Sequence, residues 1–290
     1  MKRVFKAVVA AAVVCTVLLG LAACEVSKFD ETKAISVTVR ADGSGTKSAF
    51  MEIIGLKGKA DPTGAITADT TAAVDAEVTG NPQAIAYESL GYVTDKAKML
   101  KIDGVEATVA NIQNGTYKIS RPLSVVYKAA TITSGINKHF FDFLMSKDAQ
   151  DIIAAEGYVS MNDDAAAYTK PADLSGGIEI SGSTSLQPLM EVLSEKFEEY
   201  HPNVTVTVAG GGSGQGYSNA NGGVSDFGMI SEEFNQAKAP DSVYSMVAKD
   251  GIAVIVNKKN PVGNLTMAQL KNIYDKESAS PYANWAAITA

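Results

Sequence analysis

The sequence predicts an α/β protein, because a short strand, a glycine-rich loop and a helix follow one another three times within its 290 residues. The first unit begins with the alternating apolar residues of 35–39, which indicate a strand. The loop RADGSGT follows at 40–46, and apolar residues with helical spacing run over 47–56. Repetition of this unit favours mixed helix and strand layers over an all-helical or all-strand fold.

The other two units have the same order of elements. The second unit consists of a strand at 178–180, the loop SGSTS at 181–185 and an amphipathic helix over 186–200. The third unit consists of a strand at 204–208, the loop GGGSGQG at 210–216 and a short helix. Two further helices are expected over 138–156 and 266–274, the latter with Thr266 as its N-cap.

The N-terminus has the pattern of an export signal. Basic residues precede a short apolar run that ends in Leu-Ala-Ala before Cys24, which predicts a signal peptide over 1–23 and a tether over 24–31. The Leu-Ala-Ala-Cys motif resembles the lipobox of bacterial lipoproteins. The resemblance implies lipidation of Cys24 and an anchor on the extracytoplasmic face of the cell membrane. A plain signal peptide followed by a chance cysteine is the alternative.

Charge and cysteine content exclude several classes of function. Loss of the signal changes the formal net charge from −7 to −10, and an acidic chain without basic runs is a poor partner for nucleic acid. Cys15 leaves with the signal, so the mature chain has no thiol pair for a disulfide or a cysteine-based metal site.

The glycine loops suit an anion in spite of this net charge. A helix N-terminus presents unpaired backbone N–H groups and a partial positive charge, so a glycine turn that leads into it binds anions without a basic side chain. Arg40 adds a planar fork for two oxygens. Hydroxyl donors come from the loops themselves, at Ser44, Thr46, Thr184, Ser185 and Ser213. For any one loop, a tight turn that needs positive φ remains the alternative.

The sequence contains no motif typical of catalysis or of cofactor binding. Neither a P-loop nor a well-placed dinucleotide fingerprint occurs, and GSG at 43–45 is not a nucleophile elbow. His139 and His201 are the only histidines and are expected to be structural or surface residues. The sequence therefore predicts a protein that is not an enzyme, with no catalytic residue, no cofactor and no metal site.

Three motifs in succession resemble one family. They are GSTSLQPL at 182–189, GGGSGQG at 210–216 and DFGMIS at 226–231, and further similar segments are RADGSGT at 40–46, AIAYESLGYV at 84–93 and the segment 265–285. Together they look like the phosphate-binding lipoproteins, of PstS type, of bacterial high-affinity phosphate ABC transporters. The resemblance covers nearly all of the mature chain.

The resemblance implies a fold and a function. The fold is α/β and two-lobed, a periplasmic-binding-protein-like (type II) fold in which each lobe is a mixed sheet flanked by helices and two crossover strands form the hinge. The function is capture of inorganic phosphate between the lobes and its delivery to an ABC permease by a monomer. The alternatives are a binding protein for sulfate, molybdate or tungstate, and a non-transport lipoprotein that senses phosphate.

The motifs occur in an order that differs from that of the family. There, the GST-type loop comes first and the R-x-x-G-S-G-T loop follows an Asn-Trp segment, whereas this chain starts with the latter loop and ends shortly after Asn284 and Trp285. Joining residue 290 to about residue 35 restores the family order. We therefore expect a circularly permuted chain, in which 163–177 spans the old termini.

This order predicts the limits of the lobes. Lobe two comprises 32–120 plus 251–290, with the R-x-x-G-S-G-T loop, and lobe one comprises 121–250, with the GST, GGGSG and DFG loops. The expected hinges are 120–122 and 250–252.

The family's phosphate contacts, carried over position by position, fall on both lobes. They are the side chain of Thr184, the backbone N–H of Ser185, Ser213 and Ser231 in lobe one, and Arg40, Ser44, Gly45 and Thr46 in lobe two. Some members have an Asp at the position of Ser231, where it accepts the proton of phosphate and rejects sulfate. A hydroxyl accepts or donates, so selectivity is less defined here. Asp42 is expected to hold the side chain of Arg40.

Overall fold

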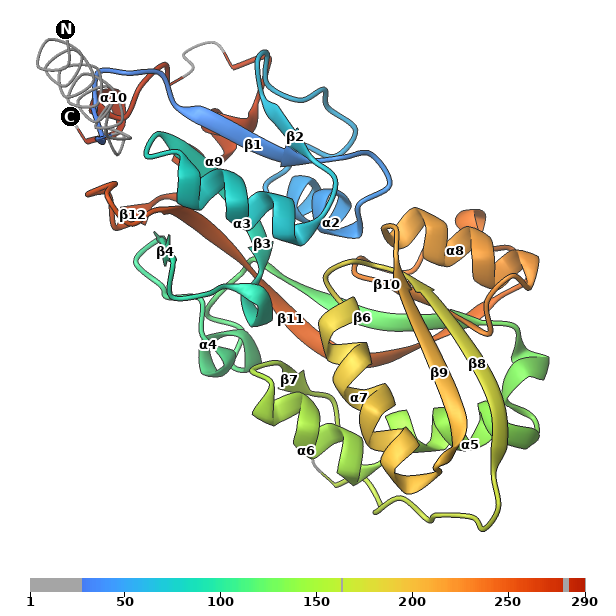
Figure 1. The fold of residues 1–290 in the computed structure, drawn as a ribbon. Helices are drawn as coiled ribbons and strands as arrows, with labels where there is room; N and C mark the ends of the chain where they lie inside the picture. Colours follow the sequence, from blue (N-terminus) through green and yellow to red (C-terminus); the bar gives the residue numbers. More distant parts are fainter. Residues whose placement is uncertain (1–27, 163, 279–281, 290) are drawn as a thin grey trace, which may run out of the picture.

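The structure, a computed structural model, describes residues 28–162, 164–278 and 282–289. Figure 1 shows two lobes, each with helices packed on its part of a shared sheet, and two long strands that run from one lobe into the other. The predicted α/β class is confirmed. The predicted signal peptide and Cys24 lie outside the described residues.

The two long strands are β6 (Ser120–Tyr127) and β11 (Val243–Asn257). Lobe two contains β1 (Ser36–Arg40), α2 (Gly45–Ile53), β2 (Ile66–Ala68), α3 (Thr71–Gly80), β3 (Ala84–Ser89), the 3₁₀ turn η1 (Leu90–Tyr92), β4 (Ala97–Met99), β5 (Lys101–Ile102), α4 (Val109–Gln113), β12 (Asn264–Leu265), α9 (Met267–Tyr274) and α10 (Ala286–Thr289). Lobe one contains η2 (Ala129–Ile132), α5 (Gly135–Leu144), α6 (Lys147–Ala155), β7 (Val159–Ser160), β8 (Ser175–Gly182), α7 (Gln187–Tyr200), β9 (Asn203–Gly210), α8 (Ser213–Gly222), β10 (Phe227–Ile230) and η3 (Gln236–Lys238).

One sheet runs through both lobes in the order β2-β1-β3-β11-β6-β10-β8-β9, and β4 and β7 also pair with β11. Strand β1 is parallel to β2 and β3, and β8 is parallel to β9 and β10, whereas β11 is antiparallel to β3 and β6. Strands β1, β8 and β9 each lead through a glycine loop into a helix, as the sequence predicts. The carboxyl ends of such strands are where α/β proteins bind their ligands.

Each lobe has a hydrophobic core of its own. In lobe two, Phe50 of α2 stacks on Tyr87 of β3 with ring centroids 3.8 Å apart. In lobe one, Phe140, Phe143 and Phe197 pack together from α5 and α7. The members of the first core lie within 39–119, at 159 and within 252–285, and those of the second within 123–248. Apart from Val159, which lies within the predicted lobe one but packs in the first core, the cores follow the predicted lobe limits, which stay a prediction.

Most local predictions are confirmed, and one is wrong. Thr266 caps α9 with a full capping box, as expected. The single helix expected over 138–156 is two helices, because α5 ends at Leu144 and Ser146 caps α6 through its hydroxyl. A serine inside an apolar periodic pattern competes for backbone hydrogen bonds in this way.

The two long strands meet at a buried ion pair. Asp250 of β11 lies opposite Arg121 of β6, and the carboxylate and guanidinium are 3.0 Å apart with each side chain 1% exposed. Burial raises the pKa of Asp250, and the charge of Arg121 opposes this shift. Arg121 also donates to the carbonyl oxygen of Ser231 at 3.3 Å. The ion pair therefore connects the strands that join the lobes to the loop after β10.

Removal of one partner of this pair should destabilise the fold strongly. Asp250→Ala leaves a buried guanidinium without its counter-ion, which costs about 3–5 kcal/mol of unfolding free energy. Urea denaturation measures the loss. The matched control is Lys57→Ala, which breaks the exposed pair with Glu52 and should leave the denaturation midpoint nearly unchanged. Equal midpoints for the two variants would contradict the structural role of Asp250.

Candidate functional site

Arg40 ends β1 with its side chain turned into the space between the lobes. Its Nε donates to the carbonyl of Ala68 at 3.2 Å and one terminal nitrogen to the carbonyl of Asp69 at 3.1 Å. The terminal nitrogens also donate to Thr71 Oγ1 at 3.2 Å and, across the cleft, to Thr184 Oγ1 at 2.9 Å. Fixed neutral acceptors therefore hold the guanidinium in one orientation.

Among the described residues, the guanidinium of Arg40 has no ion-pair partner. The side chain is 1% exposed, and no carboxylate of the described residues forms an ion pair with it. Burial, together with the charge of Arg121, lowers the pKa of Arg40 to about 10, so Arg40 is still a cation at neutral pH. A buried unpaired charge is costly, and an anion that binds beside it removes that cost.

The loop before α2 forms the lobe-two wall. Ser44 is the N-cap of α2 and accepts from the N–H of Lys47 at 3.3 Å. Thr46 Oγ1 lies 2.8 Å from Ser185 Oγ of lobe one. A side chain on Gly45 would place its Cβ 2.2 Å from Ser213 Oγ, so only glycine allows the two walls to approach this closely.

The lobe-one wall is a set of buried hydroxyls. Ser183 Oγ donates to Ser231 Oγ at 2.8 Å, and the Ser231 N–H donates to Ser213 Oγ at 3.0 Å. The N–H of Ser185 donates to Ser183 Oγ at 3.2 Å, whereas the family resemblance assigns this N–H to the anion. Buried hydroxyls need partners, and here they find them in one another and in the opposite wall.

The GGGSGQG loop brings its backbone against the lobe-two loop. The N–H of Gly214 donates to the carbonyl oxygen of Gly43 at 3.0 Å. Gly211 and Gly212 have φ of 142° and 88°, which disfavours other residues at both positions. A cavity of about 300 Å³ lies here, lined among others by Ser44, Thr184, Gly211 and Gly212. Its walls carry hydroxyls and backbone groups from both lobes, and Asp42 and Asp69 also line it on the lobe-two side.

The structure brings all eight predicted anion-site residues to this one junction. They are Arg40, Ser44, Gly45 and Thr46 from lobe two and Thr184, Ser185, Ser213 and Ser231 from lobe one. Sequence reasoning missed Thr71 and Ser183, which bond these residues directly. The signal for Thr71 was its place at the start of α3.

The role predicted for Asp42 is wrong. Its side chain is 99% exposed and pairs with Lys47 at 2.8 Å rather than with Arg40. The Lys47 hydrogen bond, followed by the charge of Lys47, lowers the pKa of Asp42. The positive φ of Gly43 turns the loop after this residue, and the neutral acceptors described above orient Arg40.

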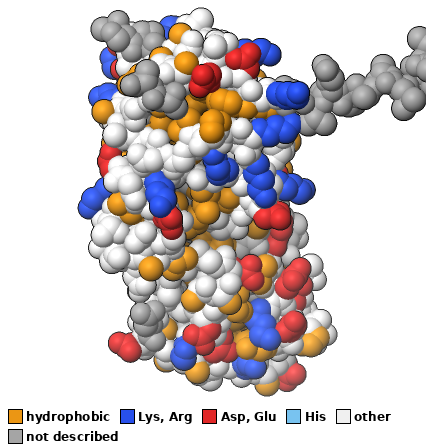
Figure 2. Space-filling view, turned by 90° about the vertical axis from the view of Figure 1, so that its left-hand side faces the viewer, with side chains coloured by type: hydrophobic (Ala, Val, Ile, Leu, Met, Phe, Trp, Pro, Cys, Tyr) orange, Lys and Arg blue, Asp and Glu red, His pale blue; other side chains and the backbone are white. Residues whose placement is uncertain are grey.

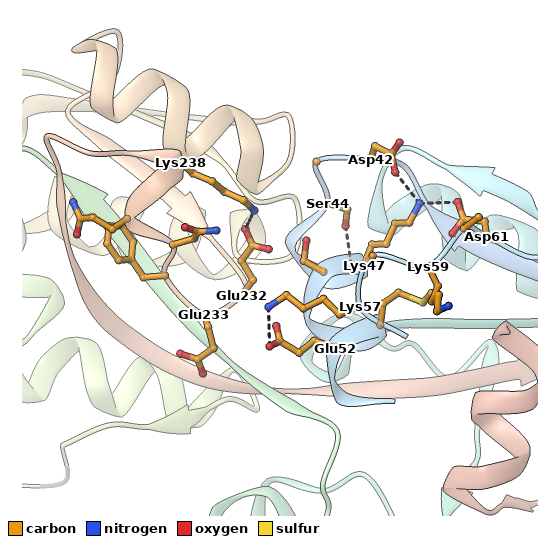
Figure 3. A pocket seen from close by; sticks show the side chains of 18 residues that line it. Asp42, Ser44, Lys47, Glu52, Lys57, Lys59, Asp61, Glu232, Glu233 and Lys238 are labelled. Carbon is orange, nitrogen blue, oxygen red and sulfur yellow. Dashed lines mark hydrogen bonds and ion pairs between the residues drawn. The ribbon is translucent and has the colours of Figure 1, made fainter. Parts of the chain in front are cut away.

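A larger cavity of about 870 Å³ opens between α2 and the segment 232–238, and Figure 3 shows it from close by. Four lysines line it, and each is paired with a carboxylate. The pairs are Lys47 with Asp42 and Asp61, Lys57 with Glu52, Lys59 with Glu277 and Lys238 with Glu232. Because these charges are compensated, Arg40 and not this larger cavity is the candidate anion site.

Charged side chains are spread unevenly over the surface. On the face drawn in Figure 2, Lys and Arg are denser over the half that holds lobe two, and Asp and Glu over the other half. Net charge therefore says little about the potential at one site. Within the described ranges, no cluster of His, Cys, Asp and Glu suits a metal ion, and no helix is long and apolar enough to cross a membrane.

Comparison with known proteins identifies the class of this one. A model described as a PBP superfamily domain matches residues 19–148 and 165–287, so the chain is a member of that superfamily. A crystal structure of a phosphate ABC transporter, phosphate-binding protein from Streptococcus pneumoniae TIGR4 matches with a TM-score of 0.69 at 32% identity. The match covers 88% of this chain and 99% of that chain. The predicted periplasmic-binding-protein-like fold is thereby confirmed.

Relatives in sequence narrow the class further. The phosphate-binding protein PstS 2 of Streptococcus agalactiae serotype V (strain ATCC BAA-611 / 2603 V/R) is 36% identical over 270 residues, covering 90% of this chain and 91% of that protein. The PstS 2 of Streptococcus pneumoniae serotype 4 (strain ATCC BAA-334 / TIGR4) is 34% identical over 266 residues, covering 88% and 90%. The chain belongs to the family of PstS phosphate-binding proteins.

The predicted permutation stays a prediction. Because the match to the PstS 2 proteins runs along nearly the whole of both chains, this chain has the same order of segments as they have. These relatives therefore share its order of motifs. The permutation hypothesis now compares this chain only with family members in which the GST-type loop comes first.

The close approach at Gly45 yields a test of this site. Gly45→Ala places a Cβ against Ser213 and Ser231, and relief of such overlap costs about 1–3 kcal/mol. Binding of phosphate, used as the test oxyanion, should weaken about ten- to a hundredfold in calorimetric titration. The melting temperature should fall by only a few degrees, because the same overlap costs about 1–3 kcal/mol in the folded structure.

The control for this change is Gly80→Ala. Gly80 ends α3, has an ordinary φ, and has open space where its Cβ would lie. This variant should bind as the wild type does. Unchanged binding in Gly45→Ala would show that the two walls do not enclose the anion together.

Proposed function

We propose that this chain is an extracytoplasmic substrate-binding protein that captures inorganic phosphate between its lobes and passes it to an ABC permease. The buried Arg40 without an anionic partner is the observation that supports the proposal most. A tetrahedral oxyanion accepts from its guanidinium and from the surrounding hydroxyls at once. The proposed function is binding without catalysis, by a monomer, with phosphate and the permease as partners.

The predicted residues divide the work of binding. Arg40 supplies the charge, and Thr184 Oγ1 lies 2.9 Å from a terminal nitrogen of its guanidinium. Ser44, Gly45 and Thr46 add the N-terminus of α2, whose backbone dipole favours an anion. The anion replaces the direct hydroxyl bonds between the walls, such as that between Thr46 and Ser185. Micromolar affinity needs about 8 kcal/mol, which several charge-assisted hydrogen bonds of about 1.5–3 kcal/mol supply after the cost of ordering.

The hydroxyl at Ser231 favours a second candidate, a binding protein for another oxyanion such as sulfate or molybdate. A fixed carboxylate at this position repels a fully ionised anion, whereas a serine does not. Ser231 Oγ accepts from Ser183 in the structure and remains able to donate. Phosphate is the first choice because the PstS 2 relatives are named phosphate-binding proteins.

Calorimetric titration of the full chain in detergent with phosphate, sulfate and molybdate tests the proposal. We expect phosphate to bind most tightly, and Arg40→Ala to weaken it by about tenfold or more, since charge-assisted hydrogen bonds are lost. Lys47→Ala is the matched control, because Asp42 and Asp61 already compensate Lys47, and it should change affinity little. No phosphate heat refutes the proposal, and tighter sulfate or molybdate binding favours the second candidate.

We further propose that Cys24, which lies outside the described residues, carries a lipid anchor that holds the protein on the extracytoplasmic face of the membrane. Its lipobox-like setting supports this. Cys24→Ser should move the protein from the membrane fraction to the soluble fraction of the producing bacterium. Intact mass spectrometry of the wild type should show diacylglycerol on the N-terminal cysteine, and an unmodified mass would refute the anchor.

A further inference from the structure

Glu88 is a buried acid that the proposed binding scheme does not use. It lies on β3 with 0% of its side chain exposed. Neither carboxylate oxygen has a hydrogen-bond partner among the described residues. An ionised carboxylate without a donor is very costly in such a place, so this position favours the neutral acid.

The topology places Glu88 and Arg40 at the same edge of the sheet, on neighbouring strands. Strands β1 and β3 are parallel neighbours, with Val37 paired to Ile85. The pairing of the two strands ends there, and three residues further along lie Arg40, the last residue of β1, and Glu88, near the end of β3. Both residues therefore lie at the carboxyl ends of the strands, where the candidate anion site is found. The charge of Arg40 acts on Glu88, and that of Glu88 on Arg40.

Charged and titratable groups from several elements surround Glu88. They are Arg40 of β1, Asp75 of α3, Tyr92 of η1 and Asp250 of β11, while Arg121 of β6 acts on Arg40. Burial, and next the charge of Asp75, raises the pKa of Glu88 to about 8, although Arg40 opposes the shift. At neutral pH the side chain is an acid, and a mildly alkaline solution ionises it.

We propose that Glu88 is a positioning residue that controls access to the charge of Arg40: as an acid it leaves Arg40 to the bound oxyanion, and as a carboxylate it competes with that oxyanion. The inference rests on the proposed function. It makes the affinity of this site for an oxyanion depend on pH, which the hydroxyls of the lobe-one wall do not do.

The proton balance of this step is simple. When Glu88 is a carboxylate, binding of one oxyanion is accompanied by uptake of one proton from the solvent, and no other bond changes. The bound anion favours the acid form because it adds a like charge next to Glu88. Affinity is therefore full well below the pKa and falls as the pH rises through about 8.

Calorimetric titration of the full chain with phosphate from pH 6 to pH 9, in pairs of buffers with different ionisation enthalpies, tests this role. At one unit above the pKa, about one molecule in eleven has the acid form, so phosphate should bind the wild type about tenfold more weakly than Glu88→Gln at pH 9. At pH 6 the two should agree. The wild type should take up nearly one proton more per phosphate at pH 9 than the variant does.

The design separates Glu88 from the titration of phosphate, which is the same for both proteins and cancels in the difference. Glu77→Gln is the control, because it removes an equal charge from α3, where Glu77 bonds Asn81, and it should keep the wild-type pH profile. Should Glu88→Gln not fold, infrared difference spectra of the wild type decide. Phosphate added at pH 9 should produce a protonated-carboxyl band, and the absence of that band overturns the inference.

The outcomes distinguish this inference from the proposed function. Identical pH profiles and proton uptake in wild type and Glu88→Gln, with phosphate bound by both, overturn the role of Glu88 and leave the function standing. Failure of both proteins to bind phosphate at every pH overturns the proposed function itself.

Discussion

A buried cation without a counter-ion is the constraint on which the site depends. Arg40 is almost wholly enclosed, yet its partners are the carbonyls of Ala68 and Asp69 and the hydroxyls of Thr71 and Thr184, all of them neutral. Such partners orient a guanidinium without cancelling its charge. Desolvation disfavours the charged form, and the surrounding structure holds it there nonetheless. A site of this kind attracts an anion because the anion forms the ion pair with the guanidinium that the neutral partners do not provide.

The two-lobed architecture makes this interaction dependent on closure. Arg40 belongs to one lobe and Thr184 to the other, and the lobes are joined by β6 and β11. The ion pair of Arg121 and Asp250 lies on those strands, and Arg121 also bonds the carbonyl of Ser231 at the site. The geometry of the joining strands and the position of the lobe-one hydroxyls are thus coupled through one side chain. Hinge motion in such proteins is absorbed by a few residues at places of this type.

Much of this arrangement follows from the sequence, because glycine loops between strands and helices have a local signature. The positions of Arg40 and Ser213 are predictable for that reason. Thr71 was missed because the turn between β2 and α3 contains no glycine. Glu88 was missed because β3 otherwise has the composition of a buried strand. The error at Asp42 has a different origin: sequence proximity suggests a pair with Arg40, whereas the fold directs the carboxylate to solvent and to Lys47. Contacts between distant segments, such as Thr46 with Ser185, are decided by lobe packing.

The composition of the walls bears on how the protein reads the protonation state of its ligand. A carboxylate fixed in the ionised state accepts a proton from the ligand and repels an anion that has none. The wall formed by Ser231 and Ser183 has hydroxyls only, which satisfy an oxygen whether or not it carries a proton. The acid that does lie close to Arg40, Glu88, is on the opposite lobe and is neutral below its raised pKa. Discrimination among oxyanions at neutral pH therefore depends on their size, on the number of hydrogen-bond donors and on the charge of Arg40. The pH of the solution sets how far the carboxylate of Glu88 competes for that charge.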